Sequence, residues 1–491
     1  MLLTSLLIIP AVAGMACLVV RPRCLMAGLA IAAFGSTLAL AVRLFQAVLK
    51  EGVVEEWNHF FYADALSAWM VLLISVVSLS SALYAGRYFK RDLAAGIVTE
   101  GRVRQFFVLT PLFVTGMFLV VLANNLGVMW FALEATALAS VLLVALYNRR
   151  TSLEAAWKYV MLGSLGLALA LLGTVFTYAA AIGQDGSEKL PSFNWSHLMT
   201  VAPRLDPRLL KLAFAFVLVG YGTKAGLAPM HTWLPDAHSE APSPTSAMLS
   251  GVSLKIAIYA LLRFHILTTA CLGSNFSSRL LLGFGLFSMF LAPPFILVQT
   301  NLKRLLAYSS LEHVGLICTG IAMNTPITIA GALLHMGYHA LTKPVLFFAA
   351  GNIHQSFHTL EMRLIGPGLA KLLPVTMVLM ALAAAAATGL PPFGLFYSEL
   401  AVIGGGFAAN NAIISVLILI ALIASFCGIL KQLTRILLGA PRRPVKSQGS
   451  TFEGVPAMGL LLAALLLFSV WMPAPVFRLV QEAARIVGGK A

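Results

Sequence analysis

The chain has 491 residues, of which 59% are apolar and only 10% charged, and its mean hydropathy is +0.91. An ordinary soluble chain carries about 25% charged residues, so this composition excludes a soluble globular protein. No polar stretch approaches the ~50 residues of a small independent domain, which excludes a soluble catalytic domain. The net charge of +15 is scattered over short loops. That distribution argues against nucleic-acid binding and is typical of the basic inner loops of a bacterial-type membrane protein.

Apolar runs of about 18 to 25 residues predict about fourteen transmembrane helices, and thus an all-α polytopic membrane protein. The predicted spans lie near residues 2–20, 25–49, 64–86, 105–123, 126–147, 158–182, 209–230, 242–265, 278–298, 304–323, 327–351, 372–404, 410–438 and 456–473. Basic residues are more frequent in the loops that follow odd-numbered helices. These loops are therefore predicted to face the cytoplasm, with both termini outside, in an inner (plasma) membrane of bacterial type.

Ionisable side chains inside the predicted spans are the main functional signal, because each costs about 2.5 to 3.5 kcal/mol at mid-membrane. They are Glu134, Lys224, Lys255, Glu312, His313, His335, His339, Lys343, Glu399 and Lys431. Three of them, His335, His339 and Lys343, are spaced i, i+4, i+8, which stacks them on one helix face over about 12 Å. The pattern favours a chain of proton carriers. Buried ion pairs that only hold helices together are the alternative, and Lys431 can extend to the surface.

Two spans carry signals for a break at membrane depth. Residues 220–229 hold three glycines, Lys224 and a proline, and residues 388–394 hold two glycines and two prolines just before Glu399. Proline and glycine interrupt helices, and such breaks are tolerated only where protein or a water-filled cavity satisfies the backbone. Corresponding breaks five helices apart predict broken helices 7 and 12 within two inverted five-helix repeats. Glu134 is the natural candidate to pair with Lys224.

The predicted domain organisation is a single integral membrane domain over residues 1–491. Residues 1–104 would form helices 1–3, residues 105–270 the first repeat (helices 4–8) and residues 271–440 the second repeat (helices 9–13). Residues 441–491 would form helix 14 and an external C-terminus. The five cysteines show neither CxxC nor Cys/His ligand spacing, and there is no phosphate-binding glycine motif, so no metal or other cofactor is expected in this chain.

The run from Gly222 to Ser246 resembles the signature of the antiporter-like proton-translocating subunits of complex I, Mrp antiporters and energy-converting hydrogenases. Residues 301–310 and 389–399 resemble the same superfamily. The segment 309–315, with its Glu-His pair, is most similar to component F of hydrogenase-4 and formate-hydrogenlyase complexes. The chain stops soon after helix 14, so we do not expect the long lateral helix that one complex I subunit carries.

The resemblance implies roles for individual residues. Glu134 would match the helix-5 glutamate, Lys224 its helix-7 partner and Lys255 the central lysine. The remaining carriers would be His335 and His339 as the helix-11 relay, with Lys343 one turn further on, and Glu399 as the terminal carrier of the glutamate type. Candidates for proton uptake are Glu312 and His313 together with three residues of the loop after helix 7, namely His231, Asp236 and His238, for which capping and packing is the alternative.

These features predict a proton-translocating membrane subunit of a multisubunit redox-driven complex of the hydrogenase-4/formate-hydrogenlyase type. Its expected partners are other membrane subunits, the lipid bilayer and a peripheral hydrogenase or dehydrogenase module, with no redox chemistry in the chain itself. The alternatives are a complex I-like NADH:quinone oxidoreductase, a Mrp-type cation/proton antiporter driven by ion gradients and a partner of an inorganic-carbon uptake system. A structural scaffold with inert ion pairs is a further alternative. A haem or metal bound by His335 and His339 is less well supported, because Lys343 follows one turn later.

Overall fold

The computed structural model describes residues 1–182, 192–366, 368–438 and 454–489, and most of these residues are helical. The helices of the first half are α1 (Leu2–Val19), α2 (Arg23–Glu51), α3 (Ala65–Ala94), α4 (Glu100–Leu122), α5 (Leu126–Val144), η1 (Ala145–Tyr147), α6 (Arg150–Ala181), α7 (Trp195–Val201), η2 (Ala202–Arg204), α8 (Pro207–Ala225), α9 (Trp233–Glu240), α10 (Ser243–Met248), η3 (Leu249–Ser253) and α11 (Leu254–Leu272). Those of the second half are α12 (Asn275–Val298), α13 (Leu302–Ala322), α14 (Pro326–Phe357), α15 (Met362–Ile365), α16 (Leu369–Leu372), α17 (Pro374–Ala387), α18 (Gly394–Ala408), α19 (Ala412–Leu437), α20 (Val455–Val470) and α21 (Ala474–Val487).

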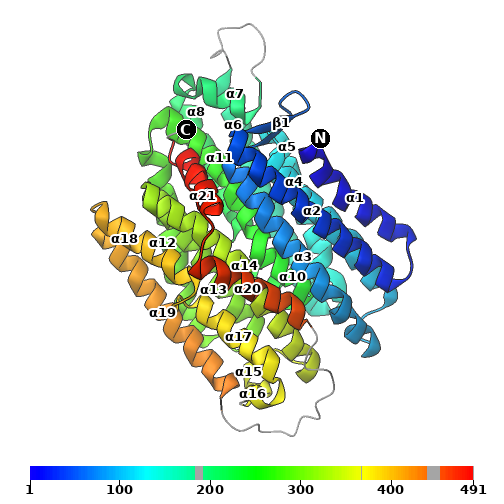
Figure 1. The fold of residues 1–491 in the computed structure, drawn as a ribbon. Coiled ribbons are helices and arrows are strands. Elements are labelled where there is room, and N and C mark those ends of the chain that lie inside the picture. The colour runs from blue at the N-terminus through cyan, green and yellow to red at the C-terminus, as the bar shows by residue number, and fades with distance from the viewer. Residues whose placement is uncertain (183–191, 367, 439–453, 490–491) are drawn as a thin grey trace.

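The long helices lie side by side in one bundle (Figure 1). A short antiparallel hairpin of β1 (Val54–Glu56) and β2 (Phe61–Ala63) lies at one end together with α7, and we call this the hairpin end. The opposite end, where α15 and α16 lie, contains the connections from α1 to α2, from α3 to α4 and from η1 to α6. Arginines lie in or beside each of these connections, for example Arg21, Arg91 and Arg149, and we call it the basic end. The all-α prediction is confirmed, and the hairpin is a small addition to it.

Ten helices in the described part of the chain are long and apolar enough to span a membrane, or up to eleven if the bent pair α20 and α21 is one span. The predicted count of about fourteen is therefore not reached by this measure. The segments that fall short include α17 and α18, which have only 14 and 15 residues because the predicted twelfth helix is broken between them. These candidate spans support a membrane location for the chain, whereas the number of spans stays a prediction.

Both predicted breaks are present. The chain leaves α8 at Ala225 and resumes as α9 after a turn in which Gly226 has φ of 78°. It leaves α17 at Ala387 and resumes as α18 after a turn in which Gly389 has φ of 65°. Glycine adopts this left-handed backbone without the steric cost of a Cβ atom. The residues after position 230, predicted as a loop, instead form α9, so that part of the prediction is wrong.

The predicted eighth helix contains a feature that periodicity does not reveal. Between α10 and α11 the chain forms a π-helix, η3, which ends two residues before Lys255. Single π turns inside α-helices occur frequently at functional sites. All of η3 and Lys255 are buried, so this irregular turn sits in the interior of the bundle.

The C-terminal part also differs from the prediction. The chain bends by 80° between α20 and α21, and α21 packs against α3 and α14. We expected helix 14 over residues 456–473 followed by an external tail, but residues 474–487 form this further helix. The predicted domain boundary at residues 440–441 lies outside the described residues.

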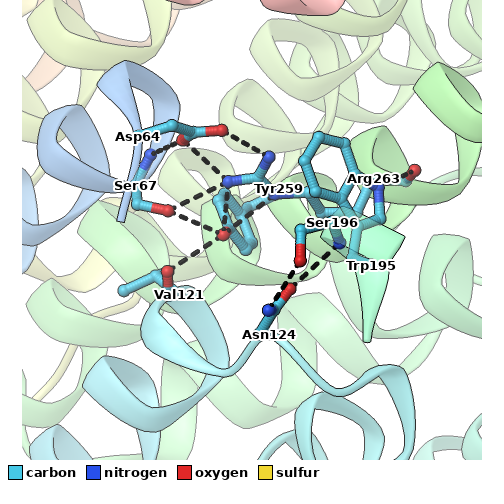
Figure 2. Close-up of polar contacts among 8 residues, drawn as sticks. All are labelled: Asp64, Ser67, Val121, Asn124, Trp195, Ser196, Tyr259 and Arg263. Atoms are coloured by element: carbon cyan, nitrogen blue, oxygen red, sulfur yellow. Dashed lines mark hydrogen bonds and ion pairs between the residues drawn. The ribbon is translucent and has the colours of Figure 1, made fainter. Parts of the chain in front are cut away.

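A buried polar cluster fixes the hairpin end, as Figure 2 shows. Asp64 caps α3 by accepting from the Ser67 N–H at 2.9 Å. Its carboxylate also accepts two hydrogen bonds from the Arg263 guanidinium of α11, at 2.6 and 2.8 Å. The Trp195 ring of α7 lies 4.3 Å from that guanidinium, and the Tyr259 hydroxyl accepts from it at 2.9 Å. Burial raises the pKa of Asp64, but Arg263 outweighs burial and leaves the pKa below its ordinary value.

Candidate functional site

A buried lysine at the π turn begins the candidate site. Lys255 is 0% exposed, and its Nζ lies 2.6 Å from Nδ1 of His339 on α14. The same Nζ donates to the backbone carbonyl of Ser250 in η3. The Ser250 hydroxyl in turn lies 2.8 Å from the hydroxyl of Ser310 on α13. Lys255 therefore contacts α14 directly, and the π turn that accepts its hydrogen bond contacts α13.

Three histidine rings continue the chain from that lysine. His313 of α13 lies between the two histidines of α14: its ring centroid is 5.0 Å from that of His335 and 4.7 Å from that of His339. Nδ1 of His313 is 2.9 Å from Nε2 of His335, whose Nδ1 is 2.9 Å from the Ser398 hydroxyl. Among the described residues, Nε2 of His313 and Nε2 of His339 have no hydrogen-bond partner. Each of these two atoms can give or take a proton without first breaking a hydrogen bond.

The chain of histidines ends at a carboxylate held by the second helix break. Glu399 follows Ser398 in α18 and is 8% exposed, and its carboxylate lies close enough to His313 and His335 for ligand atoms of all three to fall within 4.8 Å. The carboxylate rests against Gly389, where a Cβ atom would collide with it. The break thus presents this acid to the histidines. We call Lys255, His339, His313, His335, Ser398 and Glu399 the relay cluster.

These three ligand atoms form a two-histidine, one-carboxylate set of the kind that can hold a transition metal. In this arrangement, however, the facing nitrogens of His313 and His335 bind each other at 2.9 Å. A metal would have to displace that hydrogen bond. The geometry as it stands is a series of buried titratable groups, hydrogen-bonded from Lys255 to His339 and from His313 through His335 to Ser398.

Lys343 lies on the same buried face of α14 as the two histidines, as its spacing predicts. Its Nζ donates to the Leu306 carbonyl and to the Ser309 hydroxyl of α13, each at 2.9 Å. All three polar residues on this face of α14 therefore contact α13. His335 and His339 contact the His313 ring, and Lys343 binds Leu306 and Ser309.

The predicted pair of Glu134 and Lys224 is not formed. Lys224 donates instead to the Tyr159 hydroxyl at 2.5 Å, and that hydroxyl lies 2.8 Å from the hydroxyl of Ser140. Oε2 of Glu134 has no hydrogen-bond partner among the described residues. The physical reason is that α6, which carries Tyr159, packs against both α5 and α8. The Tyr159 ring also stacks on Trp233, with centroids 4.4 Å apart.

The predicted proton-uptake residues are not gathered in one place. Asp236, in α9, forms ion pairs with Lys158 at 3.1 Å and Arg304 at 2.6 Å. His238, in the same helix, is 0% exposed and its Nδ1 lies 2.9 Å from a backbone carbonyl. His231 precedes α9 in the break and is also buried. These contacts match the packing alternative stated above.

The Glu-His pair of α13 lies inside the bundle, where Glu312 is 2% exposed and His313 1% exposed. The ring of His313 contacts both histidines of α14, which places it in the relay cluster. A role of the pair in proton uptake stays a prediction.

Several site residues could not be found by searching for charges within apolar runs. Tyr159 and Ser398 bind Lys224 and His335 through their hydroxyls. Ser250 binds Lys255 through its backbone carbonyl, and its hydroxyl contacts that of Ser310. Hydroxyl groups are both donors and acceptors, so they can pass a proton without carrying charge. Tyr159, Ser310 and Ser398 each contact a partner on another helix, so their spacing along their own helices gives no signal of these contacts.

Comparison with known proteins shows the family of the chain. The family model for the transmembrane subunits of NADH:quinone oxidoreductase and Mrp antiporters matches residues 123–425. The hydrogenase-4 component F homolog of Methylacidiphilum infernorum is 37% identical, covering 79% of this chain and 82% of that protein. Subunit N of the NADH-quinone oxidoreductase of Desulforudis audaxviator is 30% identical, covering 84% of this chain and 80% of that protein.

The fold is shared with a solved respiratory complex. A chain of the archaeal membrane-bound sulfane sulfur reductase superposes with a TM-score of 0.86 at 22% identity, covering 99% of this chain and 97% of that one. The matched family region holds all six residues of the relay cluster. The chain therefore belongs to the NADH:quinone oxidoreductase/Mrp antiporter family of antiporter-like membrane subunits.

Proposed function

We propose that this chain is the proton-translocating membrane subunit of a multisubunit redox-driven complex of the hydrogenase-4/formate-hydrogenlyase type. The observation that carries the proposal is the relay cluster. It joins a central lysine to a carboxylate at a helix break through three histidines. Lys255 lies 2.6 Å from His339, and His335 lies 2.9 Å from the hydroxyl of Ser398, the residue before Glu399.

Each member of the cluster can take and release a proton at a defined atom. Nδ1 of His339 takes a proton from Lys255, and the ring releases one at Nε2. Nε2 of His313 receives it, and Nδ1 of that ring passes a proton to His335. Glu399 then holds the proton beside the break. Every group in the path is nearly inaccessible to bulk water, which prevents protons from leaking past it.

Redox energy has to reach this path from outside the chain. The titratable groups beside the two breaks, Lys224 and Glu399, are the natural receivers, because movement of a neighbouring charge or of the broken helices changes their local field. We propose other membrane subunits and a peripheral hydrogenase or dehydrogenase module as the partners that supply it. The two broken segments also support, as part of the proposal, two inverted five-helix repeats.

The similarity to hydrogenase-4 component F over most of both chains favours a hydrogenase-type complex over the alternatives. The similarity to an NADH-quinone oxidoreductase subunit keeps a complex I-like assembly as the second candidate. A Mrp-type exchanger is the third, since the family model includes Mrp subunits. All three would use the same proton path in this chain.

The test is a mild-detergent purification of this chain from its native membrane, with partners identified by mass spectrometry. Hydrogenase large and small subunits are the expected result. A set of small Mrp-type subunits without a redox protein would refute the redox-driven assembly. Proton translocation by the purified assembly in liposomes should also be lost in Lys224→Met and Glu399→Gln, and full translocation by both variants would refute a proton path through this chain.

A further inference from the structure

A surface pocket opens at the basic end of the bundle, between the last turns of α3 and α14. It has a volume of about 310 Å³. Its lining residues come from both helices and from the turn after α3: Arg91, Asp92, Ala94, Ala95, Ile97, Gln355, Ser356 and His358. The pocket lies away from the relay cluster and contains none of the residues assigned a role above.

The floor of this pocket holds a carboxylate without a charged partner. Asp92 is 2% exposed and accepts from the Tyr147 hydroxyl and from the Gln355 amide, each at 2.7 Å. Among the described residues no ion pair includes Asp92, whereas the equally buried Asp64 is paired with Arg263. A buried carboxylate is normally ion-paired, and one held only by neutral donors can gain and lose a proton without breaking an ion pair.

Hydrogen bonds lead inward from Asp92, and a buried lysine, Lys303, interacts with its charge. The Tyr147 hydroxyl lies 2.7 Å from that of Tyr88, which is one turn deeper in α3 and 2% exposed. Lys303, at the start of α13, is also 2% exposed, and its charge interacts with that of Asp92. The side chain of Lys303 donates to the carbonyl of Ala241 at 2.7 Å, which holds it inside the bundle.

Lys303 lies about one to two helical turns before the residues of α13 that bind Lys343. Three residues further along α13, the Leu306 carbonyl accepts from Lys343, the last ionisable residue of the stripe on α14. From sequence, Lys303 is one more cation of a basic loop. Its burial instead places it inside the bundle, on the same helix as the two residues that bind Lys343.

We propose that this pocket is the port through which protons from the basic side reach the relay, with Asp92 as the acceptor that faces water. Hydronium in the pocket gives a proton to the Asp92 carboxylate and leaves water. The carboxylic acid then releases the proton, which regenerates the carboxylate. Because no hydrogen bond or ion pair joins Asp92 to Lys303 in the described part of the chain, water carries the proton to the neutral amine of Lys303, which passes it on towards Lys343. This inference rests on the proposed proton-translocating function.

The test compares Asp92→Asn with Glu154→Gln in the assembled complex. Glu154 is an acid at the same end of the bundle, exposed and ion-paired with Lys158 at 2.8 Å. Proton translocation is measured in inverted membrane vesicles with a pH-sensitive dye, and assembly is checked on native gels. We expect Asp92→Asn to lower the rate by about tenfold or more, since it removes a positioned proton acceptor. Glu154→Gln should leave it unchanged, and Asp92→Glu should restore part of it.

A second variant tests access without removing the acid. Ala95→Cys, in a background that lacks the exposed Cys24 and Cys427, places a thiol on the rim of the pocket. A bulky membrane-impermeant thiol reagent should slow translocation, and reduction of the mixed disulfide should restore it. Unchanged translocation in both Asp92→Asn and modified Ala95→Cys would overturn the port. If Lys224→Met and Glu399→Gln still abolish translocation in that case, the port alone fails. If those two variants also translocate fully, the proposed function fails.

Discussion

Replacing His313 with phenylalanine tests the central link of the relay. Phenylalanine keeps a ring of similar size between His335 and His339 but removes both nitrogens. The structure gives His313 a direct 2.9 Å contact with one histidine and a 4.7 Å ring contact with the other. Removal of a positioned proton-transfer group costs about 10² to 10⁴ in rate, so we expect translocation to fall by about 100-fold or more.

The same substitution should leave the protein assembled. It leaves Nε2 of His335 without a partner, which costs about 1 to 3 kcal/mol, a small loss for a buried core of this size. The assay is dye-monitored proton uptake in vesicles, with assembly measured on native gels. Cys318→Ala, a buried substitution on the same helix away from the relay, serves as the control. Translocation by His313→Phe at the wild-type rate would refute the path through this ring.

Three further predictions concern the supports of the site. Arg263→Met leaves Asp64 buried without its partner and should destabilise the protein by about 3 to 5 kcal/mol, measured as a lower midpoint of thermal unfolding in detergent. Because the pKa of Asp64 is below its ordinary value, the contribution of this pair should be complete above the unfolded pKa of about 4 and be lost only as the pH falls below it. Gly389→Ala should displace Glu399 and lower translocation without loss of assembly, and normal translocation would contradict the role of the break. Tyr159→Phe removes the hydroxyl that accepts from the lysine of α8 and should slow translocation, whereas a Glu134-based pair would leave it unaffected.

The order and position of the main helices could be predicted from the sequence, because a bilayer imposes a minimum length of apolar residues on each span. The two breaks were also visible, since Gly226 and Gly389 lie among prolines inside otherwise apolar runs. The π turn before Lys255 and the final helix α21 were not. The π turn leaves the apolar pattern of its segment unchanged, and α21 follows an 80° bend that periodicity cannot locate.

Within the site, the sequence by itself determined which residues carry charge into the membrane and that His335, His339 and Lys343 share one helix face. Helical spacing alone dictates that result. The tertiary structure decided which groups these residues touch. It placed His313 between the two histidines and Tyr159 beside Lys224, where Glu134 was expected. It also buried Asp92 under a pocket. Partners on other helices depend on how the helices pack, and no local pattern in one helix encodes that packing.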